Sequence, residues 1–313
     1  MNIVLLESLG IAPEQLAAHA EKLASMGHTL TVYERCTDSA VIAGRCRDAD
    51  AVILANMPLS EACFEGCEHL RYVDIAFTGV DHVPMDYFRA RRIRVSNASG
   101  YATEAVAELC IGYMIALLRQ SKTAEERCRQ GGTKEGLTGH LLRYQTVGIV
   151  GAGAIGERVA ELCKAFGCRV VCHNRSLVLS QAFDDQLPLE ELLPRCDIVS
   201  LHVPLTDKTR GMIGREQLAL MKPSALLLNT ARGGVVDTEA VAEALNSGAL
   251  GGYAADVFET EPPLADHPLF HTPNTIVTPH MGFASAESMA MRAEIVFENL
   301  YAWLEGTILN EVK

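Results

Sequence analysis

Three side chains that could move protons or bind anions stand just after apolar runs of strand length in the second half of the chain. They are Arg232, Glu261 and His280. If these runs are parallel strands, their carboxyl ends meet at one edge of a sheet, so the three side chains would lie together. A histidine that donates a proton, a carboxylate that keeps it protonated and an arginine that binds a carboxylate suit the reduction of a 2-oxo acid. Each alone is more often a solvated charge or a structural histidine, so the prediction rests on their combination.

A glycine-rich turn earlier in the chain predicts where a cofactor would bind. The apolar run 146–150 leads into a Gly-x-Gly-x-x-Gly turn, and residues 157–166 then carry an apolar helical face. In such a unit the glycines allow the tight turn, the approach of a pyrophosphate and the close packing of helix on strand, and the phosphates lie at the helix N-terminus. A purely structural turn is the alternative. The cofactor-binding residues predicted here are Gly151, Gly153, Ala154, Ile155 and Gly156.

The end of the next predicted strand bears on which dinucleotide is bound. Where NAD-binding units carry an Asp or Glu for the ribose 2′-hydroxyl, this chain has Asn174. Arg175 offers a charged fork, and Asn174 and Ser176 offer hydrogen bonds, to a 2′-phosphate. The sequence therefore favours NADP(H), and NAD(H) stays possible because Arg175 could be an ordinary surface arginine.

Composition narrows the class of protein. The chain has 313 residues, 49% of them hydrophobic, which is enough for two domains with their own cores. The net charge of -12 argues against binding to nucleic acid or to an anionic membrane, since both attract clustered Lys and Arg.

No signal peptide or membrane-spanning run is visible, and the ten scattered cysteines suit a reducing cytoplasm. Cys63 and Cys67 stand four apart without a second pair nearby, so we predict no metal site.

Apolar periodicity predicts two successive α/β domains. The first ninety-odd residues alternate short strands with helices and lack a glycine fingerprint, which is typical of a small parallel sheet covered by helices. From about Gln145, six strands with helices between them fit a doubly wound nucleotide-binding domain. The predicted strands are 3–6, 29–33, 51–54, 72–76, 93–96, 146–150, 169–173, 198–203, 225–230, 252–258 and 275–279, and the helices of the first domain are 13–24, 38–45 and 61–67.

Two long helices are predicted to link these domains. One runs from Thr103 to Leu118 and is apolar on most faces, which indicates burial between domains or in an oligomer interface. The other, 284–304, is long enough to return to the first domain. The predicted fold is therefore a doubly wound Rossmann domain inserted in a smaller, flavodoxin-like parallel-sheet domain. The expected boundaries are 1–98 with 286–313 for the substrate-binding domain and 99–285 for the dinucleotide-binding domain.

Two loops of the first domain could face a ligand, because they follow predicted strands. They are residues 56–58 and 77–81. Gly79 makes the second loop the better candidate, since a glycine lets backbone N–H groups approach an anion. Plain turn chemistry is the alternative for both loops.

Together these motifs resemble the signature series of the D-isomer-specific 2-hydroxyacid dehydrogenase family. The resemblance covers nearly the whole chain, and it implies two domains whose cleft closes on substrate. It also implies a homodimer formed through the nucleotide-binding domains, which the apolar helix from Thr103 supports. The matching segments are, in chain order, 79–81, 106–108, 202–206, 229–237, 256–262 and 278–282.

The resemblance further implies a role for each matching residue. Arg232 would bind the substrate carboxylate and carbonyl, and His280 would protonate the carbonyl oxygen as hydride arrives from the nicotinamide. Glu261 would hold the imidazole, and the backbone of Thr78 and Gly79 would grip the carboxylate. The remaining cofactor-binding residues would be Val203, Pro204, Thr209, Thr230, Ala231, Gly282 and, at the nicotinamide carboxamide, Asp256.

The departures from the family pattern also carry expectations. Asn174 replaces the family's usual acid, which puts a preference for NAD in doubt. The chain ends soon after the last helix, so we do not expect the regulatory domain of some phosphoglycerate dehydrogenases. We also expect no extended N-terminal region of the kind found in formate dehydrogenases. Glyoxylate or hydroxypyruvate is the expected substrate. The alternative is a dinucleotide-sensing binding protein similar to the dehydrogenase-like corepressors, which would bind the nucleotide without turning over an oxo acid.

Overall fold

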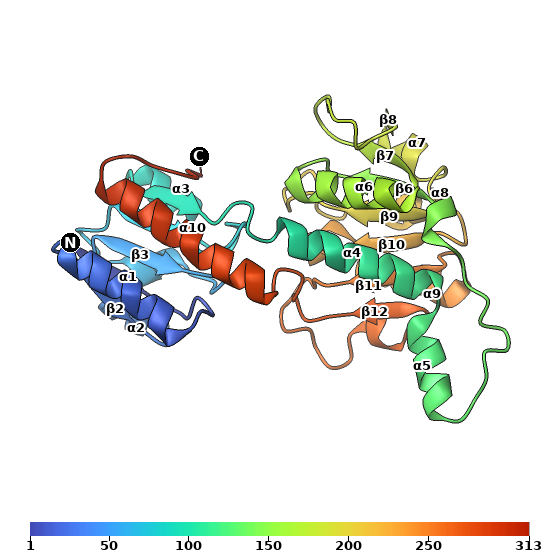
Figure 1. The fold of residues 1–313 in the computed structure, drawn as a ribbon, viewed down its shortest axis with the longest axis horizontal. Coiled ribbons are helices and arrows are strands. Elements are labelled where there is room, and N and C mark those ends of the chain that lie inside the picture. Colours follow the sequence, from blue (N-terminus) through green and yellow to red (C-terminus); the bar gives the residue numbers. More distant parts are fainter. Residues whose placement is uncertain (313) are drawn as a thin grey trace. The chain divides into compact units, whose positions relative to one another are not determined.

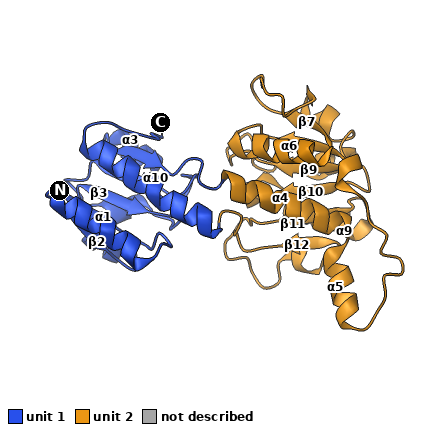
Figure 2. Ribbon diagram, viewed as in Figure 1, with its two compact units in different colours: residues 1–102, 284–313 blue, residues 103–283 orange. Residues whose placement is uncertain are grey.

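The chain folds into two compact units, which Figure 2 shows in different colours. The computed structural model describes residues 1–312. Unit 1 comprises residues 1–102 and the segment from 284 onward, and unit 2 comprises residues 103–283. Each unit is built on an all-parallel sheet that carries helices (Figure 1), so the predicted fold class is confirmed. The expected boundaries, 98/99 and 285/286, compare with 102/103 and 283/284 in the structure.

Unit 1 contains a five-stranded sheet with the order β2-β1-β3-β4-β5. The strand order reverses between β1 and β3, and open α/β sheets bind ligands beside such a switch point, at the carboxyl ends of the strands. The strands are β1 (Asn2–Leu5), β2 (Thr29–Val32), β3 (Ala51–Leu54), β4 (Tyr72–Ile75) and β5 (Arg94–Asn97), and the helices are α1 (Pro13–Ser25), α2 (Ser39–Cys46), η1 (Glu61–Phe64), α3 (Met85–Ala90) and α10 (Ala286–Leu304).

The first and last helices of the chain meet in unit 1. Helix α10 packs on β4 and lies beside α1, where His19 stacks on Phe297 with ring centroids 3.7 Å apart (Figure 1). On the same helix, Trp303 stacks on Tyr72 of β4 at 4.8 Å. These buried aromatic contacts explain why the last helix belongs to the same unit as the N-terminal strands.

The β5 edge of this sheet is covered by the last described residues. Residues 309–312 run antiparallel to β5, with the Asn97 N–H donating to the Asn310 carbonyl at 3.1 Å. The Val312 N–H donates in the same way to Val95 at 2.9 Å. Pairing of this kind removes an exposed strand edge, which would otherwise be open to association with other chains.

Unit 2 contains a seven-stranded sheet with the order β12-β11-β10-β9-β6-β7-β8, and the order reverses between β6 and β9. Right-handed crossovers in opposite directions from this point place helices on both faces of the sheet. The strands are β6 (Thr146–Val150), β7 (Arg169–His173), β8 (Asp185–Gln186), β9 (Ile198–Leu201), β10 (Leu226–Asn229), β11 (Gly252–Ala255) and β12 (Thr275–Val277). The helices are α4 (Thr103–Leu118), α5 (Ser121–Arg129), η2 (Leu142–Tyr144), α6 (Ala154–Phe166), α7 (Leu189–Leu192), α8 (Arg215–Leu220), η3 (Gly233–Val235), α9 (Thr238–Ser247) and η4 (Pro268–His271).

The apolar helix that begins at Thr103 finds its partners inside unit 2. Helix α4 packs along α6 and against β10, β11 and β12. Its buried side chains include Cys110, Met114 and Leu117. Packing within the unit therefore accounts for most of the apolar surface of α4, which no longer supports an oligomer interface.

Several predicted elements differ in extent from the observed ones. The predicted helix 61–67 is only the 3-10 turn η1, which ends at Phe64 because Glu65 is extended, with a ψ of 130°. The strand predicted at 252–258 ends at Ala255, although Val257 and Phe258 are buried. Their apolar character reflects packing, since Phe258 lies edge-on to His267 with ring centroids 4.9 Å apart. A seventh short strand, β8, was not predicted.

Candidate active site

The three candidate catalytic side chains follow three neighbouring strands of unit 2. Arg232 comes after β10, Glu261 after β11 and His280 after β12. These strands are parallel and adjacent, so their carboxyl ends form one edge of the sheet. The edge therefore carries a cation, a carboxylate and an imidazole, as the sequence predicted.

Glu261 and His280 form a close pair on this edge. His280 Nδ1 lies 2.6 Å from Glu261 Oε2, and Glu261 Oε1 accepts from the Phe258 N–H at 3.1 Å. Burial raises the pKa of Glu261, but the hydrogen bond and charge of His280 outweigh it and leave that pKa below its usual value. An ionised carboxylate only accepts hydrogen bonds, so Nδ1 carries the proton in this pair. The imidazole orientation is thus fixed, and Nε2 is the nitrogen that can exchange a proton with a substrate.

The backbone at His280 is held in an unusual conformation by Asp256. His280 has a φ of +52°, a left-handed conformation that non-glycine residues seldom adopt. Asp256 Oδ1 accepts from the Met281 N–H at 2.9 Å and from the Thr278 hydroxyl at 2.6 Å, and Oδ2 accepts from the Gly282 N–H at 2.7 Å. Burial raises the pKa of Asp256, and these hydrogen bonds oppose that rise without cancelling it. The buried carboxyl therefore shapes the loop that presents His280.

The backbone of Arg232 is held by Asn229, the last residue of β10. The Asn229 side chain donates to the Arg232 carbonyl at 2.9 Å and accepts from the Ala231 N–H at 3.1 Å. The charge of Arg232 helps to lower the pKa of Glu261, so the cation acts on the acid–base pair. Asn229 was not singled out from the sequence. The sequence marks it only as a polar residue at the end of an otherwise apolar strand, and the structure shows that its amide is fully buried.

The glycine turn has the geometry of a phosphate cradle. Gly151 has a φ of +98°, and a Cβ there would lie 2.6 Å from the His202 carbonyl oxygen. A Cβ on Gly156 would lie 2.1 Å from the Gly151 carbonyl oxygen, so α6 packs against the turn only with glycine there. A Cβ on Gly153 would meet nothing within 4 Å, so the space in front of the α6 N-terminus is open. The residues present therefore fit a bound pyrophosphate.

The loop after β7 is organised by side-chain amides. Asn174 Oδ1 accepts from the Ala152 N–H at 3.3 Å, and its Nδ2 donates to the Ser176 hydroxyl at 3.1 Å. Gln186 of β8 donates to the carbonyls of Asn174 and Ser176 at 3.2 and 2.9 Å. Arg175 is exposed between them. Gln186 was missed from the sequence because the strand that carries it has only two residues.

The other predicted cofactor-binding residues lie on loops of unit 2. Thr209 ties its own loop together, since its hydroxyl accepts from the Thr206 N–H at 2.8 Å and donates to the Pro204 carbonyl at 2.6 Å. The Thr230 hydroxyl lies 3.3 Å from Cys110 Sγ. Val203, Ala231 and Gly282 belong to loops of the same unit, whereas Thr78 and Gly79 belong to unit 1, just after β4.

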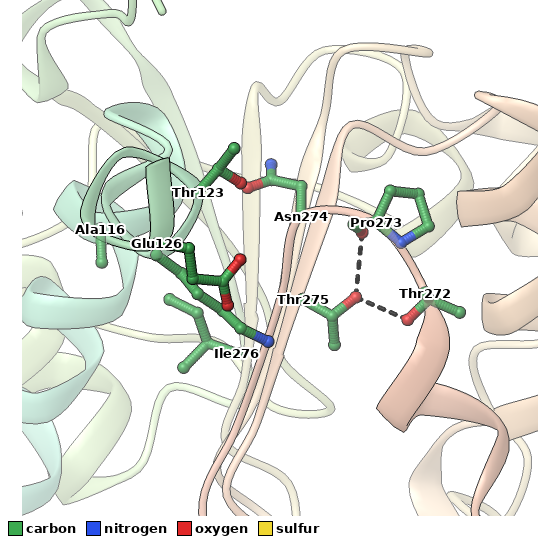
Figure 3. A pocket seen from close by; sticks show the side chains of 9 residues that line it. Ala116, Thr123, Glu126, Thr272, Pro273, Asn274, Thr275 and Ile276 are labelled. Carbon is green, nitrogen blue, oxygen red and sulfur yellow. Dashed lines mark hydrogen bonds between the residues drawn. The ribbon is translucent and has the colours of Figure 1, made fainter. Parts of the chain in front are cut away.

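A small polar pocket of unit 2, shown in Figure 3, lies away from this edge. It is lined by residues at the amino end of β12, such as Asn274 and Thr275, and by Thr123 and Glu126 of α5. His280 follows the opposite end of β12. The pocket therefore belongs to neither the acid–base pair nor the glycine turn.

Comparison with known proteins identifies the family. Residues 111–282 match the model of the D-isomer specific 2-hydroxyacid dehydrogenase NAD-binding domain. A glyoxylate reductase of Korarchaeum cryptofilum is 38% identical over 279 residues, which cover 86% of this chain and 83% of that protein. The chain belongs to the D-isomer specific 2-hydroxyacid dehydrogenase family. It is an oxidoreductase that acts on a CH–OH donor with a nicotinamide dinucleotide.

Two other similar proteins, one found by sequence and one by structure, support the family and the fold. A glycerate dehydrogenase of Methylorubrum extorquens is 35% identical over 298 residues, which cover 91% of this chain and 92% of that protein. The structure of an acyclic imino acid reductase in complex with NADPH and D-Arg covers the whole of this chain with a TM-score of 0.92 and 26% identity. The 2-hydroxyacid dehydrogenase resemblance seen in the sequence is therefore confirmed.

Two further features of the dehydrogenase concern metals and membranes. No group of three or more His, Cys, Asp or Glu side chains in residues 1–312 could hold a metal ion. In the same part of the chain, no helix combines the length and the apolar character needed to span a bilayer.

Proposed function

We propose that this dehydrogenase reduces a small 2-oxo acid, glyoxylate or hydroxypyruvate, and prefers NADPH as the hydride donor. The observation that supports this most directly is the Glu261–His280 hydrogen bond at the strand edge that also carries Arg232. Glyoxylate reductases and a glycerate dehydrogenase among its relatives support the size of the substrate. The nicotinamide, when bound, supplies or accepts the hydride.

The proposed roles follow from the chemistry of each side chain. Arg232 binds the substrate carboxylate with its guanidinium fork. His280, held by Glu261 through Nδ1, donates the Nε2 proton to the carbonyl oxygen as that oxygen gains negative charge. The pair takes that proton back in the reverse direction, and the charge of Glu261 stabilises the protonated imidazole.

The two units have separate proposed tasks. Unit 2 binds the dinucleotide through the glycine turn, with Asp256 and Gly282 near the nicotinamide end. Unit 1 binds the substrate carboxylate with the backbone of Thr78 and Gly79. Backbone N–H groups beside a glycine approach an anion closely, and the position after β4 is at the ligand-binding edge of the sheet.

The preference for NADPH rests on the loop after β7. Asn174 takes the place of the acid that would accept a hydrogen bond from the ribose 2′-hydroxyl. Arg175 is exposed there, so its guanidinium is available to a 2′-phosphate. A relative of the same fold was solved with NADPH.

We also propose that the enzyme is a cytoplasmic homodimer. Helix α5 buries none of its residues, and the nearby Leu141 and Tyr144 are 58% and 75% exposed. A second copy of the chain packed on this segment would bury both side chains. All ten cysteines are free thiols, which suits a reducing compartment. Light scattering at micromolar concentration tests the dimer, and a monomer there would refute it.

The decisive experiment compares initial rates of NADPH and NADH oxidation with glyoxylate, hydroxypyruvate, pyruvate and a bulkier aromatic oxo acid. Faster turnover of the small acids with NADPH would support the proposal. A clear preference for NADH would refute the assignment of Arg175, and a preference for the aromatic acid would refute the substrate class. Nucleotide binding without any turnover would point to a dinucleotide sensor.

A further inference from the structure

We propose that Asn97 is a positioning residue for substrate binding, and that Asn299 and Asn310 hold it in place. The proposal rests on the proposed function, because it concerns the Thr78–Gly79 loop that would bind the substrate carboxylate. All the contacts involved lie inside unit 1. They connect the C-terminal segment of the chain with that loop.

The first step is the contact between Asn97 and the loop. The Asn97 side-chain amide donates to the Thr78 carbonyl oxygen at 2.7 Å. The Thr78 carbonyl and the Gly79 N–H belong to one planar trans peptide group, so they point in opposite directions. By holding the carbonyl, Asn97 therefore sets the direction of the N–H that would bind the carboxylate. Donation to the carbonyl also polarises the peptide, which makes its N–H a stronger donor.

The start of the loop is fixed independently of this side chain. The Ala98 N–H donates to the carbonyls of Ile75 and Phe77 at 2.9 and 3.2 Å. The chain is thus anchored just before Thr78, and a rotation of the Thr78–Gly79 peptide is the remaining freedom. Asn97 restrains that rotation from the neighbouring strand.

Asn97 is itself held through both its backbone N–H and its backbone carbonyl. Its N–H donates to the Asn310 carbonyl at 3.1 Å, and its carbonyl accepts from the Asn299 side chain at 3.1 Å. The Asn310 side chain in turn donates to Asn299 Oδ1 at 2.8 Å. Asn299 is fully buried on α10, where an unsatisfied amide would be costly, so this network has a strong preference for one arrangement.

The network accounts for the left-handed backbone conformation of Asn310. Asn310 has a φ of +49°, which asparagine tolerates better than most residues, and this turns its side chain toward Asn299. The pairing of residues 309–312 with β5 then keeps Asn310 beside Asn97. Residues 309–312 are therefore coupled to the substrate loop through this chain of hydrogen bonds.

The test compares Asn97→Ala with a matched control, Asn2→Ala. Asn2 also donates its side-chain amide to a backbone carbonyl, that of Asp48 at 3.1 Å, but at the opposite end of the same sheet. Asn97→Ala should raise KM for glyoxylate about tenfold and change kcat less, because a hydrogen bond to a charged group is weakened. The Kd of NADPH should not change, since the nucleotide-binding turn is in unit 2. Asn2→Ala should leave KM unchanged.

A second variant tests the link to the C-terminal segment. Asn310→Gly keeps the backbone conformation and the carbonyl that accepts from Asn97, and removes only the side chain that binds Asn299. It should raise KM about threefold, roughly the loss of part of one hydrogen bond. A KM of Asn97→Ala within twofold of the wild type would overturn the proposal.

The two proposals fail in distinguishable ways. If the wild type turns over none of the oxo acids, the proposed function fails, and the positioning is then judged by amide hydrogen exchange of residues 77–81. Faster exchange in Asn97→Ala than in Asn2→Ala would support the role of Asn97 in fixing the loop. Equal exchange in the two variants would refute it.

Discussion

Replacing Asp74 by asparagine should stabilise unit 1 at neutral pH and remove part of its pH dependence. Asp74 is fully buried in β4, where its carboxyl accepts from the Asn299 amide at 3.2 Å and from the Tyr72 hydroxyl at 3.3 Å. Burial raises its pKa to about 8, although both hydrogen bonds act to lower it. The folded protein therefore keeps this carboxyl protonated at neutral pH, and asparagine is its neutral isostere.

The sign and size of the effect follow from proton linkage. The unfolded chain loses this proton near the ordinary aspartate pKa of 3.8, so between about pH 4 and pH 8 the folded state binds one more proton than the unfolded state. The free energy of unfolding of the wild type then falls as pH rises, by about 1.4 kcal/mol per unit. Asp74→Asn has no such proton. Its stability advantage over the wild type should grow by about 3 kcal/mol from pH 5 to pH 7.

The chain supplies its own probe for this measurement. Trp303 is the single tryptophan, and it stacks on Tyr72, two residues from the mutated position. Urea unfolding followed by its fluorescence reports on unit 1. The control is Asp86→Asn, because that side chain is 97% exposed in the same unit. A difference between wild type and Asp74→Asn that is the same at pH 5 and pH 7 would refute a raised pKa for Asp74.

Three further predictions concern the proposed site. His280→Ala should lower kcat at least about 100-fold in steady-state assays while NADPH binding measured by fluorescence is unchanged; a near-wild-type kcat would remove His280 from its role. Asp256→Asn should lower kcat/KM about tenfold or more, because an amide N–H would face the Gly282 N–H; unchanged kinetics would contradict this. Arg175→Ala should raise KM for NADPH about tenfold but not KM for NADH, and equal changes for both nucleotides would argue against a 2′-phosphate contact.

The sequence was informative about the site because parallel strands collect loop residues at one edge. Arg232, Glu261 and His280 were predicted together from their positions after apolar runs, and the structure places them after β10, β11 and β12. The adjacency of β11 and β12 brings the loops of Glu261 and His280 to the same edge, and the hydrogen bond between the two side chains depends in addition on how these loops fold. The roles assigned to the three side chains stay predictions.

Other parts of the site were not predictable because they depend on contacts between residues far apart in sequence. Gln186 organises the loop at Asn174 and Ser176 from a strand of two residues, too short for any periodicity to show. The burial of Phe258 made a strand look longer than it is, since packing and strand pairing both favour apolar residues. Apolar periodicity therefore located the elements and left the loop geometry undetermined.

Buried polar residues at strand ends carry the information that periodicity lacks. Asn229 ends an apolar strand and holds the backbone of Arg232, and Asp256 follows another and holds the loop after His280. Burying such groups is costly unless their hydrogen bonds are satisfied, so each one indicates a loop held in one conformation. Asp74 has a comparable role in unit 1 although it lies within β4, since it is connected to Asn97 through Asn299. By the same reasoning, we expect the Thr78–Gly79 loop of unit 1 to be held in one conformation, as the His280 loop of unit 2 is.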